Sequence, residues 1–479
     1  MVLQSRISRR SLITGAGSLA VFAVVGRSSQ SRAAGESVTV DDRGVFLDPD
    51  SIHSIDIAFA QADYDAVIED YRTLGEKSWM EATVSIDGFE YPQSGIRLKG
   101  NSSLMMLGNG NTGRGGTQST DSTSMSAPET LPWLIRLNKF VKGQKHQDLE
   151  RLVIRSNNSA SSLNEAVALD LLNEAGLNAQ RAAYTSFSVN GSSATLRLAI
   201  EEPAKEWLEA HFPNGGPLFK SEAGGDWSYR GTLPDDYIDI FDLEAGESGD
   251  DAADYGYLAG FLDFVNNTDD ETFVADLETR LDVEKFANYL AMMDLVQNAD
   301  DIDGPGNNSY VFFDASSSQA TVVPWDMNLA FGGLGGMGTG GRPGESNGTP
   351  PNSFFQAEEG ATPSADQTFP DTLEESDVDV PDMANPPQFG QRPGNGGMGG
   401  GMMGGRSNPL VERFTANDSF NALHTAATAT LREALFAGGI AETILDRWAT
   451  LLISEGGALI DTATVESEST AIRGAFTES

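Results

Sequence analysis

Alternating hydrophobic and polar positions open the chain and predict β-strands there. Residues 52–60 alternate with a period of two, which is the pattern of a half-buried strand. Residues 81–86 and 95–99 show the same alternation and are expected to pair as a hairpin. The early part of the chain is therefore predicted to form an antiparallel sheet.

Two further hairpins are predicted later in the chain. Residues 184–189 and 195–200 flank Asn190-Gly191, a sequence typical of a type I′ turn. Residues 309–314 and 319–323 are β-branched or aromatic runs separated by Ala-Ser-Ser-Ser, and they also indicate two antiparallel strands. The second of these hairpins would bring the start of one strand beside the end of the other.

Helical periodicity becomes more frequent toward the end of the chain. Residues 162–175 place Leu163, Val167 and Leu171 at helical spacing. Further helices are predicted for residues 203–212, 283–296 and 441–453. Strands that lead and helices that follow favour an α+β fold.

The low-complexity segment of residues 333–407 interrupts this pattern. It is rich in Gly and Met and has an acidic middle, so it offers little apolar surface to offset the chain entropy lost on folding. We expect one domain made of residues 35–332 and a helical part within residues 408–479, with a disordered insertion between them. The first 34 residues are expected to be a separate signal peptide.

The candidate chemistry lies around the hairpin of residues 309–323. Asp303 precedes Asn308 by five residues, and Asp326 ends the apolar run that follows. This set supplies a base for an attacking hydroxyl, a neutral oxygen ligand and an acidic ligand at a rigid strand end. Such a set is suited to holding Mg²⁺ and a nucleotide phosphate.

Neighbouring carboxylates offer a second register for the same site. Asp300 and Asp301 are expected to cap the turn after the preceding helix, but they remain alternatives to Asp303 as the base. Asp326 has a structural alternative as well, which is to fix a turn at the strand end. An unpaired carboxylate after Val-Val-Pro-Trp would be costly, and a bound metal would offset that cost.

The order of several short blocks resembles the CotH family of atypical protein kinases, known from spore coat protein H. In that family an Asp-x-x-x-x-Asn loop precedes a Pro-Trp-Asp strand end, as Asp303, Asn308 and Asp326 do here. The further blocks that agree are Gly95-Ile-Arg-Leu-Lys-Gly-Asn-Ser-Ser103, residues 143–152, Asn190-Gly191, Glu201, Pro217-Leu-Phe-Lys220 and Asn408-Pro-Leu-Val-Glu-Arg-Phe414. The resemblance implies a two-lobed kinase-like fold, ATP with Mg²⁺ or Mn²⁺, and a protein substrate.

Cations for the nucleotide phosphates are less sharply defined. Lys99 and Lys220 each end an apolar strand, and Glu201 ends another strand expected in the same sheet. Either lysine is thus a candidate to pair with Glu201 and contact phosphate, as kinase lysines do. Arg97 shares the face of Lys99 and is a reserve candidate, and Glu165 is a second candidate partner for the lysine.

Charge limits the partners of the chain. With 70 acidic and 31 basic residues among 479, the formal charge is −39. This charge argues against nucleic acid or an anionic membrane as the main partner. The carboxylates are dispersed along the chain, which is typical of proteins kept soluble at high salt, although an ordinary acidic secreted protein remains an alternative.

The N-terminus predicts export. Ser8-Arg9-Arg10-Ser11-Leu12-Ile13 is a twin-arginine pattern, and an apolar stretch over residues 13–25 and small residues at Ala33 and Ala34 follow it. The apolar stretch is too short to span a bilayer, so a cleaved Tat signal is favoured over a retained anchor. The chain has no cysteine, which excludes disulfides and a thiol nucleophile.

These patterns together predict an exported CotH-like kinase that acts on Ser or Thr of an extracytoplasmic or surface protein. Asp303 would be the base, Asn308 and Asp326 the metal ligands, and Lys99 or Lys220 the phosphate contact. The alternative from another class is a catalytically silent surface or matrix binding protein with the same fold. The acceptor, the oligomeric state and the source of extracellular ATP do not follow from the sequence.

Overall fold

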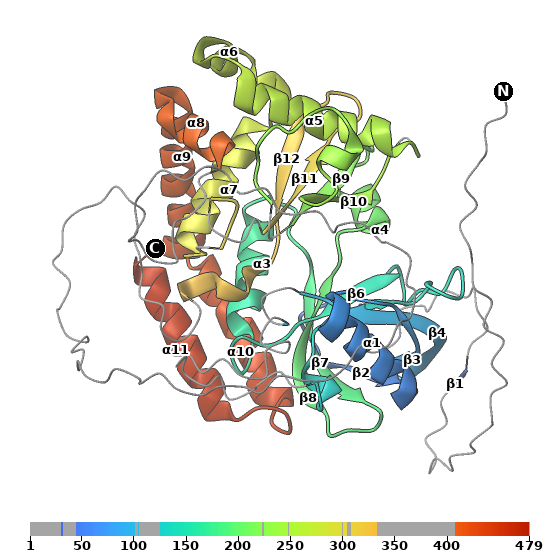
Figure 1. The fold of residues 1–479 in the computed structure, drawn as a ribbon. Coiled ribbons are helices and arrows are strands. Elements are labelled where there is room, and N and C mark those ends of the chain that lie inside the picture. The colour runs from blue at the N-terminus through green and yellow to red at the C-terminus, as the bar shows by residue number, and fades with distance from the viewer. Residues whose placement is uncertain are drawn as a thin grey trace, which may run out of the picture. The chain divides into compact units, whose positions relative to one another are not determined.

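The fold is mixed helix and sheet, so the predicted α+β class is confirmed (Figure 1). The computed structural model describes residues 30–31, 45–100, 104, 125–222, 225–247, 249–298, 300–303, 308–332 and 408–478. The predicted disordered insertion lies outside the described residues, as does nearly all of the predicted signal peptide.

The first sheet has eight strands, and most of it closes on itself. Its order is β1-β4-β3-β2-β7-β8-β6-β5, and β5 pairs with β4 as well as with β6. β2 runs parallel to β7 and β1 parallel to β4, whereas the other neighbours are antiparallel. The strands are β1 (Gln30–Ser31), β2 (His53–Ala58), β3 (Met80–Ile86), β4 (Phe89–Leu98), β5 (Trp133–Arg136), β6 (Arg151–Ile154), β7 (Ala182–Val189) and β8 (Thr195–Glu201).

Two hydrophobic cores follow from the alternation along these strands. Successive side chains of a strand point to opposite faces. Leu98 and Ile154 therefore belong to the core enclosed by the first sheet, which also contains Ile57. Leu134 and Val153 point outward and join the larger core formed with the second sheet and the helices.

The second sheet has the antiparallel order β10-β9-β11-β12. Its strands are β9 (Leu218–Ser221), β10 (Phe241–Ala245), β11 (Ser309–Phe313) and β12 (Ala320–Pro324). The predicted hairpin of β11 and β12 is confirmed, because Ser309 pairs with Pro324. Asn308 and Trp325 consequently lie at the same open end of the hairpin. Trp325 is followed directly by Asp326.

The other two predicted hairpins are also present, one of them with different bounds. Asn190 and Gly191 have φ values of 50° and 76°, as a type I′ turn requires. The first hairpin turns earlier than predicted, at Asp87 and Gly88, and β4 starts at Phe89. Pro92 hid this part of the strand, since proline cannot donate to the ladder, but an irregularity in the β3–β4 register accommodates it.

The helices on both sides of the insertion share one core. α10 and α11 lie against α3, and α9 lies against α7 (Figure 1). The helices are α1 (Gln61–Leu74), α3 (Leu163–Glu174), α4 (Lys205–His211), α5 (Asp251–Asn267), α6 (Asp270–Arg280), α7 (Val283–Leu295), α8 (Pro409–Ala416), α9 (Asp418–Leu431), α10 (Ile440–Glu455) and α11 (Thr462–Glu478). Within the described part of the chain, no helix combines the length and apolarity needed to cross a membrane.

Candidate active site

Arg155 joins three elements at the centre of the candidate site. It follows β6 directly, and its Nε donates to Oε2 of Glu165, in the first turn of α3, at 3.1 Å. Its other end donates to Oδ1 of Asp326, two residues after β12. The Arg155 and Glu165 side chains are 9% and 2% exposed, and that of Asp326 is 24% exposed. Only Asp326 in this group is therefore open to a ligand.

Burial and charge act in opposite directions on this group. Burial lowers the pKa of Arg155, but the charges of Asp326 and Glu165 outweigh it and raise that pKa overall. Burial raises the pKa of Glu165 to about 7, against the opposing charge of Arg155. The nearby negative charge of Asp326 adds to this rise. The Arg155 cation is thus held between two carboxylates that repel each other.

The backbone around Asp326 is fixed by its neighbours. Asp326 has a φ of 62°, in the left-handed region that few residues other than glycine adopt. Asn164 of α3 donates its amide to the carbonyl oxygens of Asn328 and Ala330, at 2.7 and 3.3 Å. The same helix that carries Glu165 thereby also fastens the segment that follows Asp326.

The loop before β11 carries the other predicted catalytic groups. Asn308 donates its amide nitrogen to Oδ2 of Asp300 at 2.8 Å. Oδ1 of Asp301 accepts the backbone N–H of Asp303 at 3.0 Å, which is a turn-capping contact. Residues 304–307, between Asp303 and Asn308, lie outside the described residues. The expected capping role therefore fits Asp301, whereas Asp300 binds the predicted metal ligand.

Asn408 ties the end of the chain to this loop. Its Oδ1 caps α8 by accepting the N–H of Leu410 at 2.9 Å, and its amide donates to the carbonyl oxygen of Ile302 at 3.2 Å. The residue is 3% exposed. The block that begins at Asn408 therefore holds the residue next to Asp303, although about a hundred positions separate the two segments.

A second buried ion pair lies on the first sheet. Nζ of Lys99 lies 2.9 Å from Oε1 of Glu202, and Arg151 lies 3.6 Å from the other oxygen of this carboxylate. Burial lowers the pKa of Lys99, but Glu202 and then Glu244 raise it overall. Lys99 also lies over the Trp325 ring, 5.7 Å from its centroid. The charge of Lys99 is therefore neutralised by Glu202, and its side chain lies over Trp325, the residue before Asp326.

Lys220 differs from Lys99 in its surroundings. Its Nζ donates to the carbonyl oxygen of Ser221 at 2.5 Å and lies 5.4 Å from the centroid of the Tyr310 ring. Among the described residues no carboxylate lies within ion-pair distance of it. Burial lowers the pKa of Lys220 to about 8, although the charges of Glu222 and Asp326 act in the other direction.

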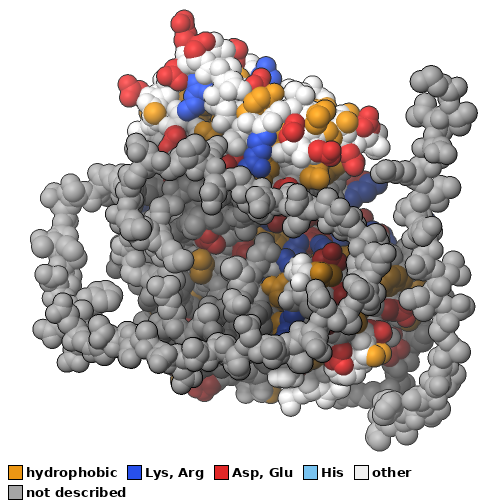
Figure 2. Space-filling model, viewed as in Figure 1, with side chains coloured by type: hydrophobic (Ala, Val, Ile, Leu, Met, Phe, Trp, Pro, Cys, Tyr) orange, Lys and Arg blue, Asp and Glu red, His pale blue; other side chains and the backbone are white. Residues whose placement is uncertain are grey.

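Figure 2 shows Lys and Arg side chains gathered near the middle of this view, with Asp and Glu side chains beside them, between the places of β10 and β6 in Figure 1. The electrostatic neighbours of Lys220 include Lys99, Asp326 and Glu244, which come from both sheets. Cations and carboxylates from the two sheets therefore lie close together in one site.

The CotH kinase protein family matches residues 96–456, about three quarters of the chain. The chain belongs to this family. The predicted resemblance is confirmed, and membership indicates a kinase-like phosphotransferase that uses ATP and a divalent metal. No curated protein matches the chain.

Two predicted cation partners are wrong in this CotH kinase protein. Glu201 pairs with Arg181, whose guanidinium lies 2.6 Å from Oε1, and not with a lysine. Lys220 belongs to the second sheet and Glu201 to the first, so the expectation that they share a sheet is also wrong. Glu165 binds Arg155 instead of a lysine.

Sequence reasoning missed Arg155 and Glu202, although each left a signal. Arg155 is a charged residue directly after the apolar run of residues 152–154, the same kind of position that singled out Lys99 and Lys220. Glu202 follows Glu201, and adjacent residues of a strand point to opposite sides. Glu201 and Glu202 therefore face different sides, and it is Glu202 that forms the buried ion pair.

The residues present fit a divalent metal. Burial and then the negative charge of Asp326 raise the pKa of Asp300, so the two carboxylates repel each other and a cation between them would relieve the repulsion. Asn308 uses its amide nitrogen on Asp300, which leaves its amide oxygen as an acceptor. Among the described residues no three His, Cys, Asp or Glu side chains form a metal cluster. Mg²⁺ in kinases needs fewer, because phosphate and water complete its shell.

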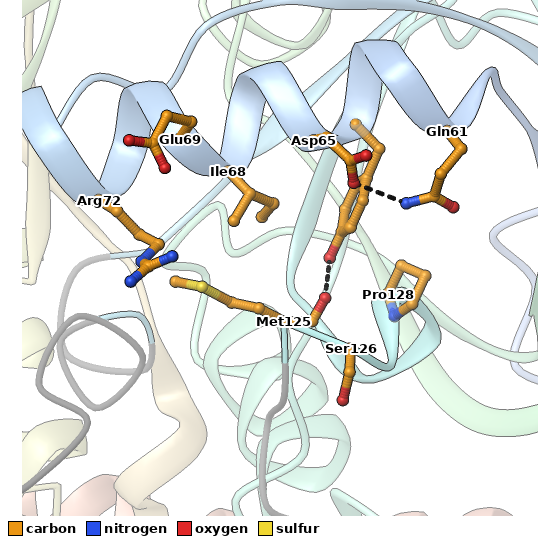
Figure 3. A pocket seen from close by; sticks show the side chains of 9 residues that line it. Gln61, Asp65, Ile68, Glu69, Arg72, Met125, Ser126 and Pro128 are labelled. Carbon is orange, nitrogen blue, oxygen red and sulfur yellow. Dashed lines mark hydrogen bonds between the residues drawn. The ribbon is translucent and has the colours of Figure 1, made fainter.

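A cavity of about 390 Å³ lies elsewhere, between α1 and the segment of residues 125–128 (Figure 3). Tyr64 lines it and donates its hydroxyl to the carbonyl oxygen of Met125 at 2.8 Å. None of the predicted catalytic or phosphate-binding residues lines this cavity. The predicted site around Asp326 is therefore separate from this cavity.

Proposed function

We propose that this CotH kinase protein transfers the γ-phosphate of ATP to a Ser or Thr hydroxyl of another extracytoplasmic protein. The observation that carries the proposal is the buried ion pair between Arg155, directly after β6, and Glu165 of α3. Protein kinases place a cation on a third strand, pair it with a glutamate of the following helix, and hold the metal with an aspartate after a later strand. β6 is the sixth strand in the described part of the chain, and α3 follows it as that helix follows the cation-bearing strand of kinases.

This correspondence supports a two-lobed kinase-like fold. The first sheet with α1 and α3 would form one lobe, and the second sheet with the remaining helices would form the other. Arg155 takes the position that kinases give to lysine. Because Arg155 already binds two carboxylates, Lys220 is the cation with charge available for a phosphate, and Lys99 stands beside it.

Asp326 and Asn308 would hold Mg²⁺ or Mn²⁺. When bound, the metal neutralises charge on the phosphate oxygens during transfer. The carboxylate of Asp303 would orient the acceptor hydroxyl and take its proton. The hydroxyl oxygen then forms a bond to the γ-phosphorus while the bond from that phosphorus to the β,γ-bridging oxygen breaks, and ADP leaves with the electron pair.

We extend the proposal to localisation. The twin-arginine pattern around Arg9 and Arg10 supports export through the Tat pathway to the cell surface or the medium. The formal charge of −39 supports an environment of high salt, where screening suppresses repulsion between carboxylates. Replacing Arg9 and Arg10 together by Lys should stop export, since the receptor distinguishes guanidinium from ammonium; unchanged amounts of processed protein outside the cell would remove the Tat assignment.

A catalytically silent binding protein with the same fold is the second candidate. The ion pair between Arg155 and Asp326 favours it, because a carboxylate neutralised by arginine does not require a metal. The two candidates differ in whether Asp326 leaves Arg155 and binds a divalent metal ion when nucleotide binds.

Two matched substitutions separate these candidates. Asp326→Ala should abolish both metal-dependent ATP binding and transfer, because a metal ligand acts in the ground state and in the transition state. Asp303→Asn keeps the shape of the loop and removes only the proton acceptor. It should retain ATP binding while transfer falls by about 10²–10⁴-fold. Nucleotide titrations and labelled-phosphate assays on the wild type and both variants measure these effects.

Three results would change the assignment. If the wild type binds no ATP with either Mg²⁺ or Mn²⁺, the binding-protein candidate replaces the kinase. If Asp303→Asn transfers phosphate at the wild-type rate, the base must be Asp300 or Asp301. Full activity of Asp326→Ala would exclude Asp326 as a metal ligand.

A further inference from the structure

Four cations gather on the outward face of β4, β5 and β6, and one of them, Arg151, reaches Glu202 of the candidate active site. They are Arg97, Arg136, Lys139 and Arg151, and we refer to them, together with the ring of Trp79, as the basic platform. Arg136 and Arg151 face each other directly across the β5–β6 ladder. Like charges at directly opposed positions destabilise a sheet, so this register carries a cost.

A glycine and an aromatic ring build the platform. Gly95 pairs with Arg136 across the β4–β5 ladder. A Cβ at this position would lie 2.5 Å from Cβ of Lys139 and 3.0 Å from the Trp79 ring, so only glycine lets both side chains rest on the strand. Arg97 and Lys139 lie 5.0 and 4.8 Å from the centroid of the Trp79 ring. The cations are therefore held in place by packing.

The charge of the platform is poorly neutralised. Arg136 donates its Nε to the neutral side-chain oxygen of Asn138 at 2.9 Å. Nε of Arg97 is buried and has no hydrogen-bond partner among the described residues. Burial lowers the pKa of Lys139, and the charges that lower it further are those of Arg136, Arg97 and Arg151. An anion on the platform would relieve this repulsion.

Carboxylates near the edge of the platform neutralise part of its charge. Glu150 accepts the amide of Asn138, and burial followed by the negative charge of Glu206 raises its pKa. Glu202 is shared between Arg151 and Lys99. The balance remains cationic around Lys139, in a chain with only 31 basic residues and a formal charge of −39.

The phosphates of a nucleotide bound next to Asp326 do not account for Arg136 and Lys139. Arg151 and Arg155 lie on one strand and its continuation, four residues apart, or about 13 Å at 3.3 Å per residue. A nucleotide with its γ-phosphate at Asp326 would direct its uncharged base and sugar away from Asp326. Arg136 pairs with Gly95, four residues before Lys99 along the chain, so Arg136 and Lys139 remain for a different anion.

We propose that the basic platform binds carboxylates of an acidic acceptor protein, and so selects acceptors whose Asp or Glu residues lie several positions from the phosphorylated hydroxyl. This inference rests on the proposed kinase function, because a protein is an acceptor only if the chain transfers phosphate to it. An extended chain covers the 13 Å of strand with about four residues. Arginine and lysine on an aromatic ring suit carboxylate side chains, which accept bidentate and charge-assisted hydrogen bonds.

The test uses two peptides and three forms of the full chain. Both peptides are fluorescently labelled and contain one Ser; the first has a run of Glu starting four residues from it, and the second has Gln at those positions. The platform variant is Arg136→Gln with Lys139→Gln. The control variant is Lys205→Gln with Arg432→Gln, which makes the same charge change at exposed positions outside the platform. Peptide binding by fluorescence anisotropy, ATP binding and phosphate transfer are measured for each form.

We expect the Glu peptide to bind the wild type at least tenfold more tightly than the Gln peptide. The platform variant should lose this preference, and the control variant should keep it. ATP affinity should be equal in all three forms. Because the net charge of the chain repels an acidic peptide, a preference for Glu must come from a local surface.

Equal binding of the two peptides, or no binding of the Glu peptide, would overturn the inference. So would a loss of ATP affinity in the platform variant, since the platform would then belong to the nucleotide site. A Glu preference that disappears in the platform variant, without transfer to any peptide, supports the acidic partner and removes only the kinase function.

Discussion

Arg155 and Lys220 are two buried cations of the candidate site that differ in how their charge is neutralised. Arg155 binds the carboxylates of Glu165 and Asp326, and its pKa is raised overall. Lys220 donates to a backbone carbonyl oxygen, and burial lowers its pKa to about 8. The difference separates two tasks. We expect a cation whose charge is neutralised within the protein to position other groups, and a cation without a carboxylate partner to be available to a phosphate.

Removal of Arg155 should have the largest effect. Arg155→Met leaves Glu165 buried without its partner, so the free energy of unfolding should fall by about 3–5 kcal/mol at pH 8. Transfer should fall by about 10³-fold, because Asp326 and α3 lose their common anchor. Chemical denaturation and labelled-phosphate assays measure both effects. Arg155→Lys is the matched control and should recover part of each.

The loss of stability in Arg155→Met should also depend on pH. The pKa of Glu165, already about 7, would rise further without Arg155, so the carboxyl would be protonated at low pH. The folded pKa lies above the unfolded one, and stability therefore falls as pH rises between them. A variant as stable as the wild type at pH 8 would show that Arg155 does not position these groups.

Removal of Lys220 should have a smaller effect, with the opposite sign on stability. Lys220→Met should weaken ATP binding by about 10–100-fold, since it removes the cation available to the phosphates. It should raise the free energy of unfolding by about 1–3 kcal/mol, because a buried charge without a carboxylate partner is removed. A marked loss of stability would indicate that Lys220 is a structural cation like Arg155.

The pH dependence of ATP binding sharpens the same contrast. Lys220 should lose its proton as pH rises through about 8, so ATP affinity should fall by up to tenfold for each pH unit above that value. Lys220→Arg should bind ATP with little change over this range, since guanidinium stays charged. For stability the sign is reversed. The folded pKa lies below the unfolded one, so the destabilisation caused by this residue is constant below pH 8 and is lost as pH rises from about 8 to 10.5.

The smallest effect is expected at Glu201, the glutamate that the sequence favoured. Glu201→Gln should leave ATP affinity unchanged, because Glu201 binds Arg181, whose side chain is 47% exposed. The loss in unfolding free energy should stay below about 1 kcal/mol, as for other partly exposed pairs. Glu202→Gln is the informative comparison, since it leaves the buried Lys99 without its ion-pair partner. Equal results for the two variants would place the lysine partner elsewhere.

Features that depend on neighbouring stretches of chain followed from the sequence. The hairpin of β11 and β12 is local, so its alternation and the turn between its strands were enough to predict that Asn308 and Asp326 lie at the same end of it. The α3 helix and the turn at Asn190 were predicted for the same reason. The spacing from Asp303 to Asp326 also led to the family, which the match over residues 96–456 confirms.

Only the tertiary structure decided which cation meets which carboxylate. Arg155 and Asp326 are 171 positions apart, and Lys99 and Glu202 are 103 positions apart. Alternation predicts that a side chain leaves one face of a strand, but it does not predict which strand or sheet lies opposite. The closure of the first sheet through β4 and β5, and the pairing of β6 with β8, set those neighbours. The energy of a buried charge depends on them, because burial costs free energy that only a partner within a few ångströms offsets.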